Sequence, residues 1–198
     1  MRSYRTVNLN LLWFLIALNV LIFVIELAVG GYPITIDNPV VRLLGLSAVQ
    51  LAQQPWTIIS SVFVHGGFGH NLFNMISLYF LGSFFLRATG ERSFLAVFFL
   101  GGLAGNAVYV LLAPPNVIGI GASGAIFAIG GALAVIVPKA PVYVFFIPIA
   151  MPLWAAILIF FLLSFLFSGV AWQAHLGGVL AGVIAGFILR RRRRFNYF

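Results

Sequence analysis

The chain has 198 residues, of which 63% are hydrophobic and only 7% are charged, with a net charge of +8. A mean hydropathy of +1.13 excludes an ordinary soluble domain and leaves almost no polar sequence for a separate one. The sequence contains no cysteine, which excludes disulfides, a thiolate nucleophile and cysteine-ligated metals.

Long apolar segments recur along the chain, and they predict an all-α polytopic membrane protein with six transmembrane helices. We place these spans at about residues 9–29, 69–87, 94–113, 122–137, 152–168 and 172–189. We expect residues 1–198 to form a single membrane domain, with a short basic lead at 1–8 and a basic tail at 190–198.

The basic residues predict the orientation of these spans. With a cytoplasmic N-terminus, the inner segments hold all but one of the 11 Lys and Arg residues, the exception being Arg42. The positive-inside rule therefore places both termini in the cytoplasm. Arg190–Arg194 then anchors the topology and can bind anionic lipid. Because the charge follows the membrane topology, we exclude nucleic acid as a partner.

The connections differ in length. Residues 30–68 form the long outer loop, which is half apolar, so we expect it to lie on or dip into the outer leaflet; a mobile linker is the alternative. We place Glu26, near the outer end of the first span, within reach of interfacial water. Prolines before the fifth span predict an interfacial segment at 142–149 and a helix start at about Pro152.

Small residues recur at every fourth position in two of the spans. They are Ala174, Gly178, Gly182 and Gly186 in the last span, and Gly124, Ala128 and Ala132 in the fourth. Such stripes allow two helix backbones to approach closely. We therefore expect these two helices to touch.

Ser123 opens the fourth span, two residues after Gly121. The flanking glycines let backbone approach closely, and a helix start leaves free N–H groups beside the hydroxyl. This arrangement suits a nucleophile whose reaction develops negative charge. Alternatively, glycine and serine at this position simply serve helix packing.

His175 lies about one turn into the last span, beside the small-residue stripe that can bring it against Ser123. A histidine within hydrogen-bond reach of a serine hydroxyl can act as its general base. Glu26, Asp37 and Glu91 are the only carboxylates, and none is well placed to complete a triad. We therefore predict a Ser-His dyad; the alternative is a packing histidine bonded to a backbone carbonyl.

His70 and Asn74 are four residues apart on one face of the second span. Together with the N–H of Ser123, their side chains predict an oxyanion hole. Hydrogen bonding between helices is the alternative for this pair. We assign His65 a structural role, tying the outer loop to the top of the second span; direct participation in catalysis is the alternative. Polar residues near these sites are expected to line a water-filled cavity open to the outside: Ser60, Ser61, His65, His70, Asn71 and Asn74.

Three motifs together resemble those of the rhomboid intramembrane serine proteases, specifically the minimal six-helix prokaryotic type. They are His65-x4-His70-x3-Asn74, Gly121-Ala122-Ser123-Gly124 and Ala174-His175-Leu176-Gly177-Gly178. The resemblance implies a multi-pass protein of the cell membrane whose active site opens to the extracytoplasmic side. It implies substrates that are single-pass membrane proteins, a lateral gate between the second and fifth spans, and no metal or cofactor.

The resemblance also assigns supporting positions, at some of which this sequence departs from the family. Trp56 lies at the characteristic tryptophan of the outer loop, but Thr57 follows it where arginine is common. Leu86 replaces a glutamate often found late in the second span. Phe127 replaces a tyrosine, so it can stack on the His175 ring but cannot donate a hydrogen bond.

Other functions remain as alternatives. A catalytically inactive rhomboid-like protein would bind transmembrane helices without cutting them, but its usual mark is loss of the serine or histidine, and both are present. A transporter or channel would need charges inside the membrane, which the spans are expected to lack. A helix-packing scaffold would use neither Ser123 nor His175.

Overall fold

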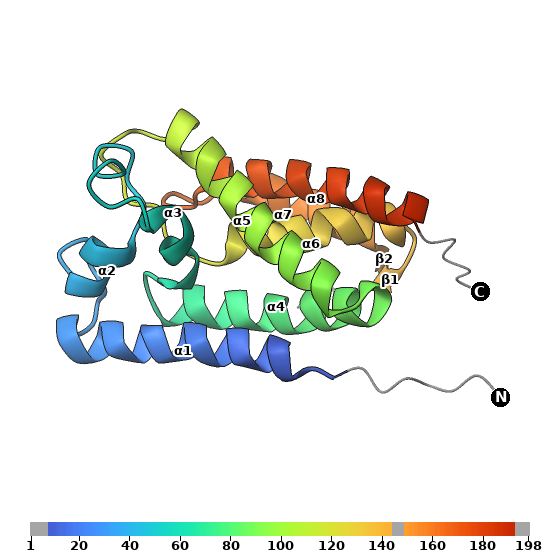
Figure 1. Ribbon diagram of the computed structural model, residues 1–198, viewed down its shortest axis with the longest axis horizontal. Helices are drawn as coiled ribbons and strands as arrows, with labels where there is room; N and C mark the ends of the chain where they lie inside the picture. The colour runs from blue at the N-terminus through green and yellow to red at the C-terminus, as the bar shows by residue number, and fades with distance from the viewer. Residues whose placement is uncertain (1–7, 144–148, 193–198) are drawn as a thin grey trace.

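Helices make up most of the computed structural model, which describes residues 8–143 and 149–192 (Figure 1). Within these ranges, four helices are long and apolar enough to cross a membrane: α1 (Asn10–Gly30), α4 (Phe68–Thr89), α5 (Glu91–Leu112) and α8 (Trp172–Arg192). Two further apolar helices are shorter, α6 (Ser123–Ile136) and α7 (Leu153–Leu163). The chain is thus a helical multi-pass membrane protein. Each of the six helices lies at a predicted span, but α7 ends at Leu163, where the prediction extended to residue 168. A full crossing by α6 and α7 remains a prediction.

The helices form a bundle in which α1 and α4 run side by side (Figure 1). The start of α1 and the end of α8 lie at the same end of this bundle, and the start of α6 lies towards the other. The predicted lead at 1–8 and tail at 190–198 fall mostly outside the described residues. Whether the termini are cytoplasmic therefore remains a prediction.

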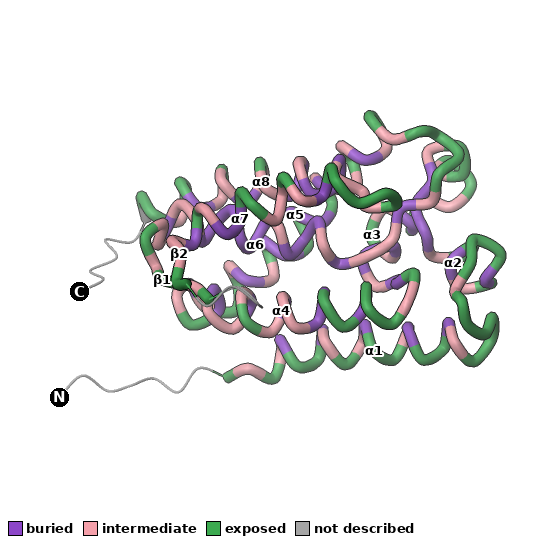
Figure 2. The backbone as a smooth tube through the Cα atoms, turned by 180° about the vertical axis from the view of Figure 1, so that it is seen from behind, coloured by how far each residue is buried: buried purple, intermediate pink, exposed green. Residues whose placement is uncertain are grey.

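Helix α6 is the centre of the bundle and contacts α4, α5, α7 and α8. Buried residues run along it, whereas α1 exposes much of its length (Figure 2). A side chain added at Gly178 or Gly182 would strike the backbone carbonyl of Gly124 or Ala128, respectively. The predicted contact between the two small-residue stripes is therefore confirmed.

The outer loop is folded and contains two short helices, α2 (Pro39–Leu44) and α3 (Thr57–Ser60), and the 3-10 helix η1 (Ser61–Phe63). Asn38 accepts from the N–H of Val40 and donates to the carbonyl of Glu26, so one side chain caps α2 and ties it to α1. The indole of Trp56 donates to the carbonyl of Leu43 at 2.8 Å, anchoring the loop with threonine at position 57. These bonds argue against a mobile linker.

A second tie joins this loop to the segment that precedes Ser123. Leu46 and Gly119 exchange both backbone hydrogen bonds, at 2.9 and 2.7 Å. The outer loop therefore holds the approach to the start of α6.

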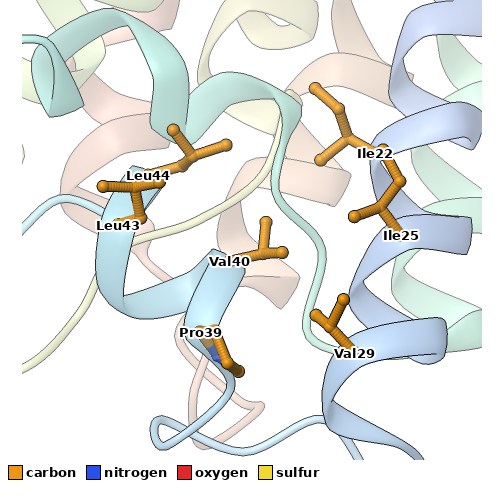
Figure 3. Close-up of a pocket in the computed structure, with 7 residues that line it drawn as sticks. All are labelled: Ile22, Ile25, Val29, Pro39, Val40, Leu43 and Leu44. Carbon is orange, nitrogen blue, oxygen red and sulfur yellow. The ribbon is translucent and has the colours of Figure 1, made fainter.

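Helix α2 folds back towards the C-terminal half of α1 and leaves an apolar pocket of about 320 Å³ between them (Figure 3). Seven residues line it: Ile22, Ile25, Val29, Pro39, Val40, Leu43 and Leu44. None of them belongs to the polar cluster around Ser123.

After α6 the chain reverses through a short antiparallel pair, β1 (Pro141–Val142) and β2 (Met151–Pro152). This pairing was not predicted. Most of the expected interfacial segment at 142–149 falls on residues 144–148, which lie outside the described residues. Helix α7 begins at Leu153, directly after Pro152, which agrees with the predicted start.

Glu26 contradicts two expectations from the sequence. It was expected to reach interfacial water, and the spans were expected to contain no buried charged residue. The structure buries Glu26 completely, with 0% exposure, because the connection between η1 and α4 covers its carboxylate. The polar partner comes from a residue 39 positions away, which the local sequence does not reveal.

Candidate active site

Ser123 and His175 meet where two helices begin. Ser123 is the first residue of α6, and His175 lies in the first turn of α8. His175 Nε2 lies 2.8 Å from Ser123 Oγ. The close backbone contact between Gly124 and Gly178, one turn along α8, explains why side chains on two different helices come so near.

An aromatic side chain packs against the His175 ring. Phe127, one turn after Ser123, packs against the imidazole with ring centroids 4.3 Å apart and ring planes inclined by 32°. For Nε2 to accept the serine proton, the imidazole must carry its own proton on Nδ1. His175 Nδ1 is buried and has no hydrogen-bond partner among the described residues.

The three carboxylates either bond to other groups or lie far from the Ser123–His175 pair. Glu26 accepts from the backbone of His65, and Asp37 pairs with Arg42 at 2.9 Å. Glu91 opens α5, directly after the end of α4 that is far from His70. Within the described part of the chain, no three His, Asp or Glu side chains are grouped as metal ligands.

His70 lies against the backbone just before Ser123. Gly121 has φ +117°, and a Cβ built there would lie 2.8 Å from both Cε1 and Nε2 of His70 and 3.9 Å from Ser123 Oγ. This glycine is therefore required both by its conformation and by the close approach of the imidazole. His70 as a residue is exposed, and its Nε2 and Cε1 atoms lie beside Gly121, two residues before Ser123.

The other nitrogen of His70 is occupied. The N–H of Gly66 donates to His70 Nδ1 at 3.4 Å. A nitrogen that accepts a hydrogen bond carries no proton in the neutral ring, so the proton resides on Nε2. The edge of His70 that faces Gly121 is consequently a hydrogen-bond donor.

The position of Asn74 relative to Ser123 is less direct than that of His70. Its amide nitrogen donates to the carbonyl of His70, one turn earlier, at 2.8 Å. An amide nitrogen has a second hydrogen, which this bond leaves free. Within the described residues no hydrogen bond joins Asn74 to Ser123, so its part in an oxyanion hole remains a prediction.

His65 is enclosed rather than open to a cavity. It has 0% exposure, and its ring packs edge-on against His70 with centroids 5.1 Å apart. Burial, together with the charge that His70 can carry, lowers the pKa of His65 to about 3, so the ring is neutral at physiological pH. Ser61 is also buried, with 1% exposure. The expectation that both residues line an open cavity is wrong, because the folded outer loop buries these two of its own side chains.

Asn106 on α5 is a supporting residue that the sequence reading missed. Its amide donates to the carbonyl of Ile58 at 2.8 Å and to Ser61 Oγ at 2.9 Å. The carbonyl of Ser61 in turn accepts from the N–H of Gly121 at 2.9 Å. The available signal was a lone asparagine in an otherwise apolar span, where polar side chains are costly and usually serve a purpose.

Comparisons with known proteins agree with these motifs. The Rhomboid domain family model matches residues 52–192. "RHOMBOID-like protein 5" of Arabidopsis thaliana is 33% identical over 163 residues, which are 80% of this chain and 52% of the relative. "Putative rhomboid protease YdcA" of Bacillus subtilis is 29% identical over 151 residues, 72% of this chain and 71% of the relative.

A third relative is considerably longer than this chain. "Rhomboid protease GluP" of Bacillus subtilis is 29% identical over 135 residues, 68% of this chain and 26% of that protein. The matched region thus spans about half of RHOMBOID-like protein 5 and about a quarter of GluP.

Proposed function

Because this chain belongs to the rhomboid family, whose model matches well over half of its residues, we propose that it is an intramembrane serine endopeptidase. It hydrolyses peptide bonds in or near the transmembrane segments of single-pass membrane proteins. The observation that carries the proposal is the 2.8 Å distance between His175 Nε2 and Ser123 Oγ at the start of two helices.

The reaction follows from the positions of these two side chains. Ser123 Oγ attacks the carbonyl carbon of the scissile peptide, and His175 Nε2 takes the hydroxyl proton. Nε2 then returns this proton to the leaving amine as the C–N bond breaks. Water hydrolyses the resulting acyl ester, with His175 again removing and returning a proton. No carboxylate participates.

The negative oxygen of the tetrahedral intermediate needs donors that are already in place. The N–H of Ser123 is available because the first N–H groups of a helix have no intrahelical acceptor. His70 supplies Nε2–H from beside Gly121, on the side of this glycine where Ser123 Oγ also lies. Asn74 is the third proposed donor. Removing one such donor typically lowers kcat by about 10²–10³.

The substrate enters from the bilayer between α4 and α7. Phe73 of α4 and Phe160 of α7 meet edge-to-face with ring centroids 6.1 Å apart, and this apolar contact is where the two helices would part. The protein resides in the cell membrane with cytoplasmic termini, and the site opens to the extracytoplasmic side, where water is available. Arg190–Arg194 contacts anionic lipid on the inner side.

One observation favours a second function, an inactive rhomboid-like protein that binds transmembrane helices. His175 Nδ1 has no partner among the described residues, so hydrogen bonding does not select the tautomer that a general base needs. Binding without cleavage requires neither Ser123 Oγ nor this tautomer.

Cleavage of a generic single-pass helix substrate by purified protein in liposomes separates the two functions. Ser123→Ala and His175→Ala should each reduce cleavage to background, while Ser83→Ala, a serine on α4 that bonds the carbonyl of Phe80, should retain it. Cleavage that survives Ser123→Ala contradicts the proposed protease. A folded parent that binds the substrate without cutting it supports the second function.

A further inference from the structure

Glu26 is a buried carboxylate to which the proposed mechanism assigns no role. It lies in the last turns of α1 with 0% exposure. A carboxylate in such a place costs free energy unless hydrogen bonds compensate for the lost hydration. Both of its oxygens face one group, the backbone N–H of His65, at 3.1 and 3.3 Å.

The bonded peptide belongs to the short connection between η1 and α4. The next N–H along this connection, that of Gly66, donates to His70 Nδ1 at 3.4 Å. Two successive N–H groups thus point to Glu26 and to His70, respectively. Because adjacent peptides share a Cα, a shift of the His65 peptide moves the Gly66 N–H with it.

We infer that Glu26 is a positioning residue for His70, acting through the His65 and Gly66 peptides. Its carboxylate holds the connection so that the Gly66 N–H reaches Nδ1 and keeps the imidazole proton on Nε2. The importance of this proton for catalysis rests on the proposed protease function, in which His70 donates to the oxyanion.

The tautomer determines whether His70 helps or opposes the reaction. With the proton on Nε2, the edge beside Gly121 and Ser123 donates a hydrogen bond. With the proton on Nδ1, the same edge presents a lone pair towards the negative oxygen, which is repulsive. A weak bond of 3.4 Å can select between these forms only while the donor stays in position.

A purely structural role for Glu26 is the competing explanation, and α1 offers a matched control. Asn19 lies seven residues earlier on the same face and also has 0% exposure. Among the described residues it donates only to the carbonyl of Leu15, within its own helix. Asn19→Leu removes a buried polar group from α1 without touching the connection to α4. The tie from Asn38 to the Glu26 carbonyl survives any change of the Glu26 side chain.

Kinetics with a single-pass substrate test the inference. Glu26→Leu removes the acceptor, and Glu26→Asp withdraws it by one methylene. Both should lower kcat on the order of 10- to 100-fold, as expected for a misplaced catalytic group, with little change in KM. Glu26→Gln keeps an acceptor oxygen and should restore most of kcat, and Asn19→Leu should keep it. Equal losses in Glu26→Leu and Asn19→Leu, or in Glu26→Leu and Glu26→Gln, would overturn the inference.

A second readout does not depend on proteolysis. The ¹⁵N resonances of labelled histidines, assigned with His70→Gln, report which ring nitrogen of His70 carries the proton. We expect the Nε2–H form in the parent, Glu26→Gln and Asn19→Leu, and its loss in Glu26→Leu and Glu26→Asp. If Glu26→Leu does not fold, both kcat and the His70 tautomer are measured on Glu26→Asp instead.

The two readouts separate failure of the inference from failure of the proposed function. A tautomer that follows Glu26 in a parent that cuts nothing supports the positioning role and contradicts the protease. Cleavage that depends on Ser123, combined with a His70 tautomer unchanged in both Glu26→Leu and Glu26→Asp, contradicts the positioning role and leaves the protease intact.

Discussion

The contact between α6 and α8 and the connection from α1 to α4 hold the same site by different means. Between α6 and α8, small residues bring one backbone against another, as where Gly182 lies against Ala128. Around the connection, polar side chains bond to distant backbone groups, as Glu26 does to His65 and Asn106 does to Ile58.

Substitutions in the two regions should therefore destabilise the folded protein for different physical reasons. A close backbone contact has no room for an added atom and fails by steric overlap. A polar tie in an apolar environment fails when one partner is removed, because the other is left buried without a hydrogen bond. The following substitutions test this contrast, in order of decreasing expected effect.

Gly182→Ala should have the largest effect on folding. The added Cβ would strike the carbonyl of Ala128, a backbone group that cannot turn aside. We expect a loss of about 3 kcal/mol in the free energy of unfolding, at the upper end of the usual cost of overpacking. Thermal unfolding in detergent measures it. Gly69→Ala is the control, because its Cβ would meet nothing within 4 Å, and an equal loss there would contradict steric overlap as the cause.

Gly121→Ala should separate activity from stability. Its Cβ would lie 2.8 Å from His70 Nε2, so we expect the imidazole to move and kcat to fall by about 10²-fold. The positive φ adds strain of about 1–3 kcal/mol. Gly90→Ala has φ +87° and open space around its Cβ, so it should lose comparable stability and keep kcat. Parallel losses of kcat in both variants would refute the role given to Gly121.

Asn106→Leu should weaken the polar network without blocking the site. It leaves the carbonyl of Ile58 and the hydroxyl of Ser61 without their donor, at a cost of about 1–3 kcal/mol in the free energy of unfolding. Chemical denaturation in mixed micelles measures this loss. Ala107→Leu adds the same apolar side chain at the neighbouring exposed position and should be nearly neutral. Indistinguishable stabilities of the two variants would count against the network.

Phe127→Leu should have the smallest effect. It removes the ring stacked 4.3 Å from the His175 imidazole, an interaction of about 0.5–1.5 kcal/mol. We expect kcat to fall a few-fold with KM unchanged, and single-turnover acylation isolates this step. Phe127→Tyr retains the ring and should match the parent, and a tyrosine variant as slow as the leucine one would show that stacking is not the cause.

The sequence by itself determined the architecture of the bundle. The positions of α1, α4, α5 and α8 follow from apolar length, because a bilayer imposes a minimum run of hydrophobic residues. The apolar sequence also located α6 and α7, which the structure makes shorter. The meeting of α6 and α8 follows from small residues at every fourth position, since the helical repeat turns that spacing into one face. Ser123 and His175 could also be predicted as a pair from the sequence, because each lies at the start of one of these two predicted helices.

Only the tertiary structure decided which polar groups support that site. Glu26 and His65 are 39 residues apart and Asn106 and Ser61 are 45, so their pairing leaves no periodic trace in the chain. The tautomer of His70 likewise depends on the Gly66 N–H, whose direction is set by the fold. Helix packing is encoded in local repeats, whereas a hydrogen bond between distant residues exists only after the backbone has brought its donor and acceptor together.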